Sequence, residues 1–213
     1  MAHADGHRTG KDALGNSTPR INQSVTLDAS RSGDVDSPTL KVEWDLDGDG
    51  DLDLVVGNFG ISRYYLNNGT AAPFSGVGGS DITTDAHDTY SVALGDVDGD
   101  GDLDLVAGNV GHANRLYLNN GTAAPFSGVA GIDITTDSHN TASVALGDVD
   151  GDGDLDVVAG NSGEANRLYL NNGTAAPFNG VAGSDIPTDL RTPSSLVLGD
   201  VDGDGDLVVV AGN

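Results

Sequence analysis

Aspartate recurs at every second position of a short segment that the chain repeats. The segment GDVDGDGDLD runs from Gly95 to Asp104, returns unchanged at Gly147–Asp156, and returns almost intact at Gly199–Leu207. Like charges this close repel one another and disfavour a compact chain. A bound cation would offset that repulsion, because alternate carboxylates on a tight loop can converge on one ion. The spacing therefore predicts a loop that binds a metal ion.

Calcium is the ion that this spacing favours. Ca²⁺ takes about 6–8 oxygen ligands in flexible geometry, whereas Mg²⁺ keeps several waters and demands near-ideal octahedral geometry. Glycines such as Gly99 and Gly101 allow the backbone to turn sharply around an ion. The alternative is an acidic solvated turn without metal. The same nine-residue spacing, complete three times, favours calcium.

An EF-hand is excluded although its loop opens in a similar way. That motif needs a glutamate at its twelfth position and a helix on each side. The twelfth position of the four loops is occupied by Val56, Ala107, Ala159 and Ala211. The segment that follows each loop also has the pattern of a strand.

Composition and charge exclude several classes of partner. The chain has 213 residues, a net charge of −24 and no cysteine. Such an acidic chain disfavours nucleic acid and anionic membrane surfaces as partners. No stretch approaches the roughly 18 apolar residues of a membrane span, so membrane insertion is not expected.

The acidic loops belong to an internal repeat. They open at Asp45, Asp96, Asp148 and Asp200, which are spaced 51, 52 and 52 residues apart, and the text between them recurs as YYLNNGTAAPF once and LYLNNGTAAPF twice. A fixed period near 50 residues is typical of propellers, solenoids and arrays. We therefore expect four units, which start near residues 45, 96, 148 and 200.

Each unit reads as β-structure throughout. Residues 91–97 lead into the acidic loop, residues 103–109 lead out of it, and residues 114–120 alternate apolar and polar side chains. A further strand is expected within residues 132–137. Three or four short strands per unit are what a propeller blade requires. The predicted fold class is an all-β, β-propeller-like array of four units of about 52 residues, with a β-solenoid as the alternative.

Two aromatic residues occur once in every repeat. They are the tyrosines 65, 117 and 169 and the phenylalanines 74, 126 and 178. A ligand-binding role is one interpretation. Packing between neighbouring units is the favoured one, because a periodic core needs periodic large side chains.

The segment GDVDGDGDLDLVAGN followed by LYLNNG and PF resembles the FG-GAP and VCBS repeats, the former known from integrin α-subunit propellers. The resemblance covers roughly residues 40–213. It implies that a D-x-D-x-D-G-x-x-D loop joins two strands of a blade and binds calcium through side chains 1, 3, 5 and 9 and the carbonyl of position 7. The implied ligand sets are Asp45, Asp47, Asp49, Asp51 and Asp53; Asp96, Asp98, Asp100, Asp102 and Asp104; Asp148, Asp150, Asp152, Asp154 and Asp156; and Asp200, Asp202, Asp204 and Asp206.

The fourth loop departs from this pattern at its ninth position. Val208 stands there in place of aspartate. Because calcium affinity depends on the number of charged ligands, we expect three strong sites and a fourth that is weak or empty.

The residues before the first loop are expected to differ from the repeats. Residues 1–20 are polar and are predicted to be disordered. Residues 24–50 resemble the first half of a PKD-type β-sandwich without its later strands, so residues 21–44 are expected to add a strand or two to the array formed by residues 45–213. That addition could close a four-unit ring. Association with a second copy is the alternative.

The function expected from these features is binding without catalysis. His87 and His139 are repeat-equivalent, but Arg191 takes that place in the next unit, and His112 is replaced by Glu164. Histidines that change between copies do not form a catalytic pattern. We expect a calcium-binding adhesion or ligand-binding module at the cell surface or outside the cell, with a protein or glycan ligand. The alternatives are a lectin-like module and a non-catalytic accessory part of a secreted enzyme.

Overall fold

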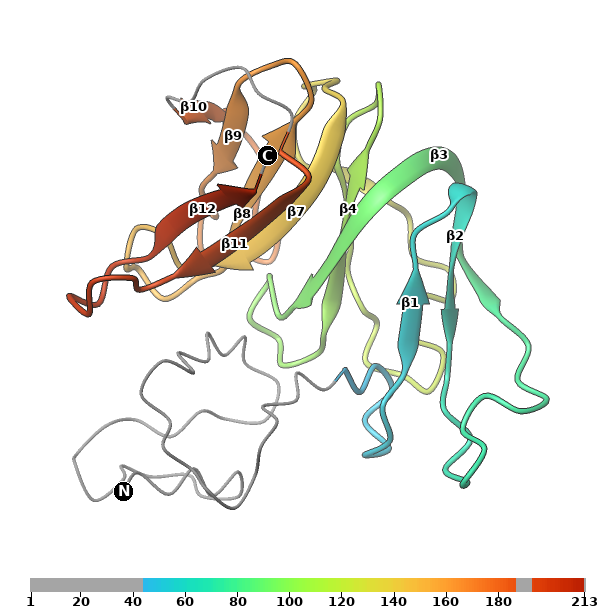
Figure 1. Cartoon of the computed structure of the whole chain (residues 1–213). Coiled ribbons are helices and arrows are strands. Elements are labelled where there is room, and N and C mark those ends of the chain that lie inside the picture. Colours follow the sequence, from blue (N-terminus) through green and yellow to red (C-terminus); the bar gives the residue numbers. More distant parts are fainter. Residues whose placement is uncertain (1–43, 187–192, 213) are drawn as a thin grey trace, which may run out of the picture.

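The computed structural model describes residues 44–186 and 193–212, and Figure 1 shows their course. All regular elements in these residues are strands, so the predicted all-β class is confirmed. The strands are β1 (Leu54–Val56), β2 (Phe59–Tyr65), β3 (Ser80–Gly95), β4 (Asp104–Asn109), β5 (Arg115–Tyr117), β6 (Ile132–Asp133), β7 (Thr141–Gly147), β8 (Asp156–Asn161), β9 (Asn166–Tyr169), β10 (Ser184–Ile186), β11 (Ser195–Gly199) and β12 (Val208–Gly212). The described residues contain no helix that is long and apolar enough to cross a membrane.

The strands form three antiparallel sheets. Their orders are β1-β2-β3-β4-β5-β6, β10-β9-β8-β7 and β11-β12. Within each sheet, every strand pairs with the next one along the chain. The sheets follow one another in space as they do in sequence (Figure 1). Within the described residues they are not closed into a ring, so the array is propeller-like and open.

The register of the strands shows that the units are equivalent. In the second unit β4 pairs with β5 so that Val106 lies opposite Leu116. In the third unit β8 pairs with β9 so that Val158 lies opposite Leu168. The first unit repeats this with Val55 opposite Tyr64. The fourth unit has β11 and β12 among the described residues.

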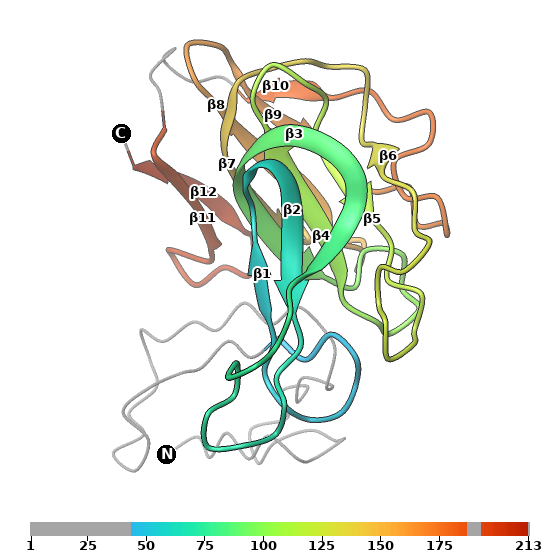
Figure 2. The same ribbon diagram turned by 90° about the vertical axis from the view of Figure 1, so that its right-hand side faces the viewer.

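Strand β3 belongs to two units at once. Its first half, up to Asp88, pairs with β2, and its second half, from Thr89, pairs with β4. Figure 2 shows how it curves from one partner to the other. The corresponding stretch between the second and third units is divided into β6 and β7, and a single bridge joins Val110 to Asn140. The fourth strand expected within residues 132–137 is therefore present, but it has only two residues.

A shorter β1–β2 connection explains the continuity of β3. Four positions separate Asn58 from Ser62, whereas five separate Asn109 from Asn114. The shorter connection leaves the start of β2 extended, so Phe59 and Ile61 pair with the first half of β3. That pairing keeps the segment in strand conformation up to the second unit.

The hydrophobic core lies between consecutive units rather than within one. One buried cluster joins Leu46, Tyr64 and Ile82 of the first unit to Leu105 and Phe126 of the second. The other cluster repeats this arrangement one unit later and includes Val97, Leu116, Ile134, Val157, Tyr169 and Phe178. A unit therefore buries its apolar surface only against its neighbours, as in other repeat proteins.

The aromatic residues that recur once per repeat pack in these clusters. Tyr117, Tyr169, Phe126 and Phe178 are buried, which confirms the packing interpretation for those copies. Phe74 of the first unit is 40% exposed. The same residue type is thus buried or exposed according to whether a preceding unit packs against it.

At the boundary between the second and third units, the backbone at Gly95 comes close to a side chain of the next unit. A Cβ atom on Gly95, at the end of β3, would lie 2.8 Å from Leu155 Cδ1 of the third unit. Such a distance is below normal van der Waals contact, so a larger residue would displace the end of the Leu155 side chain.

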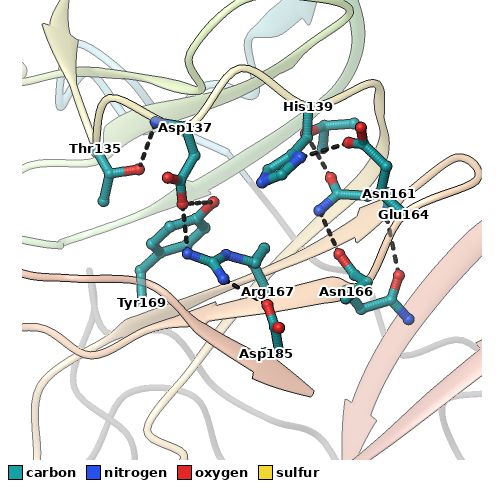
Figure 3. Close-up of polar contacts among 11 residues, drawn as sticks. Thr135, Asp137, His139, Asn161, Glu164, Asn166, Arg167, Tyr169 and Asp185 are labelled. Carbon is teal, nitrogen blue, oxygen red and sulfur yellow. Dashed lines mark hydrogen bonds and ion pairs between the residues drawn. The ribbon is translucent and has the colours of Figure 1, made fainter. Parts of the chain in front are cut away.

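Ion pairs also join the units. Arg115 of the second unit lies 2.7 Å from Asp85 of the first, and Arg167 of the third lies 2.7 Å from Asp137 of the second. Figure 3 shows Arg167 between Asp137 and Asp185. Burial opposes ionisation of Asp85, but the bond from Arg115 holds the pKa of this carboxyl below its usual value.

The segments predicted to precede the array lie outside the described residues. These are the segment 1–20, for which disorder is predicted, and the PKD-like segment up to residue 43, with the candidate closing strand.

Phe126 and Phe74 provide a matched test of this arrangement. We expect Phe126→Ala to lower the free energy of unfolding by about 3–5 kcal/mol, because it leaves a cavity between two units. Phe74→Ala should lower the free energy of unfolding much less, because 40% of this residue is already exposed. Denaturant unfolding in the presence of calcium measures both losses. Equal losses would contradict a core located between the units.

Candidate metal centre

Each acidic loop connects the same two strands of its unit. The second loop joins β3 to β4, the third joins β7 to β8, and the fourth joins β11 to β12. The first loop lies directly before β1. Because the units are equivalent, the loops occupy equivalent places in successive units.

Three carboxylates converge in every loop. In each group one oxygen per residue lies within 4.8 Å of the others. The groups are Asp45, Asp47 and Asp53; Asp96, Asp98 and Asp104; Asp148, Asp150 and Asp156; and Asp200, Asp202 and Asp204. These groups contain hard oxygen donors at a mutual distance that one cation can bridge.

The first aspartate of the loop shapes the backbone. In the second loop, Asp96 accepts hydrogen bonds from the backbone N–H groups of Gly99 and Gly101 through its two oxygens, at 2.9 and 3.1 Å. Both glycines have positive φ, 78° and 101°. This is the region that L side chains rarely adopt, so glycine is required at both positions. The other three loops repeat this geometry.

The ninth-position aspartate is buried and fixed by the backbone. One Asp104 oxygen accepts from the N–H of Val97 at 2.9 Å, and the other accepts from the N–H of Asn119 at 2.8 Å. Asp53 and Asp156 make the equivalent bonds. This side chain therefore holds the start of the loop to the end of the unit's third strand.

In the first three loops the aspartates at the fifth and seventh positions lie apart from the converging carboxylates of the first, third and ninth positions. In the first three loops the fifth aspartate is outside the converging group, and its oxygen accepts from the backbone N–H of the seventh, as Asp100 does from Asp102 at 2.9 Å. The seventh side chain lies against the turn after the third strand. A Cβ on Gly121 would lie 2.6 Å from Asp102 Oδ2. The positions concerned are Asp49 and Asp51, Asp100 and Asp102, and Asp152 and Asp154.

The fourth loop converges without a ninth-position carboxylate. Asp204 of the fifth position joins Asp200 and Asp202 in the group, and Asp206 donates its backbone N–H to Asp204. Val208 begins β12 and is 43% exposed. The buried carboxylate that anchors the other three loops is thus replaced by a partly exposed apolar side chain.

Burial and mutual repulsion make these carboxyls harder to ionise. Burial raises the pKa of Asp104 to about 7, although the hydrogen bonds from Asn119 and Val97 favour the charged form. Burial also raises the pKa of Asp53 and Asp156. Burial and the neighbouring carboxylates raise the pKa of Asp98.

A cation would relieve this electrostatic cost. Among the described residues, the ion pairs formed by arginine and histidine do not include the loop aspartates. Within the part of the chain that the structure describes, the carboxylates therefore converge without a cationic side chain paired to them. The donor set fits a hard metal ion, which would supply the missing positive charge.

An asparagine at the same position of successive units connects neighbouring loops through side-chain hydrogen bonds. The Asn119 side chain donates to the carbonyls of Leu103 in its own unit and Leu46 in the preceding loop, at 3.1 and 3.0 Å. Asn171 does the same with Leu155 and Val97. Because Leu46 and Val97 also donate to the ninth-position aspartates, a continuous chain of hydrogen bonds joins the first three loops.

Sequence reasoning missed the part played by these asparagines. The signal was present, since the first asparagine of LNNG recurs at positions 67, 119 and 171. Because asparagine and glycine tolerate positive φ, the pattern by itself indicates only a turn.

A family model independently recognises the same segments. The model of the FG-GAP-like repeat matches residues 45–107, 96–159 and 148–211. Each match begins at one acidic loop and extends past the next. The chain belongs to the FG-GAP-like repeat family. The three matches together include the fourth loop. A comparison with curated proteins finds none that matches.

The raised carboxyl pKa values predict how pH affects this FG-GAP-like protein when metal is chelated. A carboxyl with a raised pKa binds its proton more tightly in the folded state, so stability falls as pH rises from about 4 to about 7. For Asp104 alone the change is up to about 4 kcal/mol at 1.36 kcal/mol per pKa unit. The melting temperature in chelator should therefore be higher at pH 5.5 than at pH 8.

Asp104→Asn is the control, because it removes this titrating group. Its melting temperature in chelator should depend less steeply on pH than that of the unmodified protein. His87, whose pKa is lowered by burial and by His112, acts in the opposite sense below about pH 6.5. A chelated protein that becomes more stable from pH 5.5 to pH 8 would contradict the prediction.

Proposed function

We propose that this chain is a calcium-binding repeat module that works outside the cell by binding a ligand, without catalysis. The observation that carries the proposal is the convergence of three carboxylates in each of four equivalent loops. Acidic groups can cluster without metal, but these recur at the first, third and ninth positions of three loops, and all four loops have a backbone shaped by the same two glycines.

Calcium fits this donor set better than magnesium. The carboxylates come from a flexible, glycine-containing loop, and Ca²⁺ accepts irregular oxygen coordination, whereas Mg²⁺ requires near-ideal octahedral geometry. Asp45, Asp47 and Asp53, with their equivalents in the other loops, would hold the ion. The family resemblance adds Asp49 and its equivalents and the carbonyls of Asp51, Asp102 and Asp154.

Calcium would make the array rigid because the loops are linked. An ion held in one loop orders its ninth-position aspartate, which is bonded to the same asparagine that reaches the preceding loop. Each ion also neutralises part of a chain with net charge −24. Sites of modest affinity suit millimolar extracellular calcium, which supports an extracellular or cell-surface location.

An exposed aromatic pair in the first unit is the surface we propose for the ligand. Phe59 and Tyr90 are 72% and 57% exposed, and their rings meet edge to face with centroids 5.1 Å apart. The equivalent positions of the second unit carry Val110 and Ala142. Exposed aromatic side chains are enriched where proteins bind partners, and they also provide stacking platforms for sugars. The ligand is therefore a protein or a glycan.

The histidines support a role without catalysis. The His87 and His112 rings lie against each other with centroids 4.4 Å apart, whereas His139 is bonded to Glu164. These groups occupy the boundaries between units, where they join one unit to the next. They lack the nucleophile–base–orienter geometry expected of an active site.

Association with a second copy is the way we propose that the array is completed. Strand β12 is the last strand of its two-stranded sheet, and Val208 and Val210 on it are exposed. An exposed apolar edge strand is a template for strand addition. The outer strands of another copy would satisfy its free backbone groups.

The number of calcium sites tests the proposed cofactor. Calorimetric titration should give three strong sites and one weak site, each strong site adding about 2.7 kcal/mol of stability at a hundredfold excess over its dissociation constant. Asp104→Val copies the fourth-loop sequence into the second loop and should remove one strong site. Val208→Asp should strengthen the fourth. Four equal sites in the unmodified chain, or the same melting temperature with calcium and with chelator, would contradict this scheme.

Ligand capture tests the proposed binding role. The full chain, immobilised in calcium, should retain protein from cell-surface extracts or bind defined glycans on an array, and chelator should release the ligand. Phe59→Ala should weaken binding at least tenfold without altering the calcium titration. Val197→Ala, at another exposed apolar residue, is the matched control and should leave binding unchanged. Equal effects of the two substitutions would exclude the aromatic pair as the binding surface.

A further inference from the structure

A cavity lies at the boundary between the second and third units. Its volume is about 580 Å³, within the range of small-molecule sites, which is roughly 300–1,000 Å³. Its lining combines residues 132–137 after β5 with residues 176–183 before β10. It includes none of the loop aspartates, so it is separate from the metal centre.

The cavity is apolar on its buried side. Leu116, Ile134 and Phe178 line it and are at most 5% exposed. Ile132 also lines it and is 44% exposed, which places an apolar side chain where the cavity meets the surface. An apolar buried side favours a ligand with an apolar body, because burial removes both surfaces from water.

The equivalent boundary one unit earlier shows what shape fits there. Tyr64 occupies the position of Leu116, as the register shows: Tyr64 lies opposite Val55 and Ser80, and Leu116 lies opposite Val106 and Ile132. The Tyr64 ring is buried and packs edge to face on Phe126, with centroids 5.6 Å apart. Phe178, the equivalent of Phe126, lines the cavity. The second unit therefore offers a leucine where the first unit inserts a phenol ring.

Charge at the cavity favours a neutral ligand. Arg167 lines it, but Asp137 and Asp185 already pair with this guanidinium (Figure 3). Asp133, which pairs with Arg115, lines the cavity as well. Because each of these arginines is shared by two carboxylates, the local formal charge is negative and an anion would be repelled.

A polar atom on the ligand has a donor to meet. Arg115 Nε donates to Asp85 at 3.1 Å, whereas Arg167 Nε is buried and has no hydrogen-bond partner among the described residues. A hydroxyl beside Arg167 would supply the missing acceptor after a small rotation of the guanidinium. A buried donor gains more from such a bond than an exposed one.

We propose that this cavity binds a neutral aromatic ring of phenol size, which takes the place that the Tyr64 ring holds in the neighbouring boundary. The ring packs on Phe178 and Leu116, and its hydroxyl faces Arg167. The site is independent of the calcium loops and of the aromatic pair at Phe59.

The test uses 4-methylphenol, the free equivalent of a tyrosine side chain, and the full chain in calcium. Calorimetric titration should show one saturable site. Toluene, which lacks the hydroxyl, and 4-methylbenzoate, which is anionic, should each bind at least tenfold more weakly. No saturation up to the solubility limit of 4-methylphenol overturns the proposal. Equal binding of toluene overturns the role of Arg167.

Two matched substitutions locate the site. Leu116→Tyr fills the cavity with the chain's own ring, so it should raise the melting temperature and weaken 4-methylphenol binding at least tenfold. Tyr64→Leu opens the equivalent space in the neighbouring boundary and should raise the stoichiometry from one to two. Each variant should keep the calcium titration of the unmodified chain, which shows that it is folded. Unchanged affinity in Leu116→Tyr, or a stoichiometry of one in Tyr64→Leu, overturns the assignment.

Discussion

The buried carboxylate at the ninth position of the acidic loop is the constraint on which the array depends. A charged group at this depth is costly unless it is hydrogen-bonded and balanced by opposite charge. Asp104 meets the first condition with two backbone N–H groups, one at the start of the loop and one after the unit's third strand. The second condition is left to a cation. The fold of the unit and the affinity of the loop for metal are therefore set by the same side chain.

The contacts between units are determined by the small size of each unit. A unit of three or four short strands has too little surface to bury a core of its own, and the chain places its core between successive units. Arg115 and Arg167 add ion pairs at the outer side of these boundaries, and Asn119 and Asn171 add hydrogen bonds beside the loops. Each of these two boundaries thus combines an apolar centre with polar contacts that fix the position of one unit against the next.

Most of the fold could be predicted from the sequence because the sequence repeats the same unit several times. Repetition identified the unit, and alternation of side chains identified its strands. The converging carboxylates were predicted as ligands, but their separate roles were not. Spacing alone does not show that Asp104 is buried while Asp100 is bonded to the loop backbone. That difference arises from the third strand, which reaches the loop only in the folded unit.

Features that break the repeat were the hardest to predict. The continuous strand β3 follows a connection that is one residue shorter before Ser62 than in the next unit, and Tyr64 stands where the next two units carry leucine, with the cavity beside Leu116. Each is a small change in sequence whose effect appears only when a neighbouring unit packs against it. An alignment of the repeats shows where such changes are, but the packing decides what they do.

The likeness of successive boundaries has a consequence for how such a protein can change in length. Leu46, Ile82 and Phe126 at one boundary correspond to Val97, Ile134 and Phe178 at the next. A unit inserted in register would present both of its faces to surfaces that already fit them. Duplication of one unit therefore adds a loop and a boundary together, without requiring any compensating substitution. The array can grow by whole units, and its length is free to vary while its local chemistry stays constant.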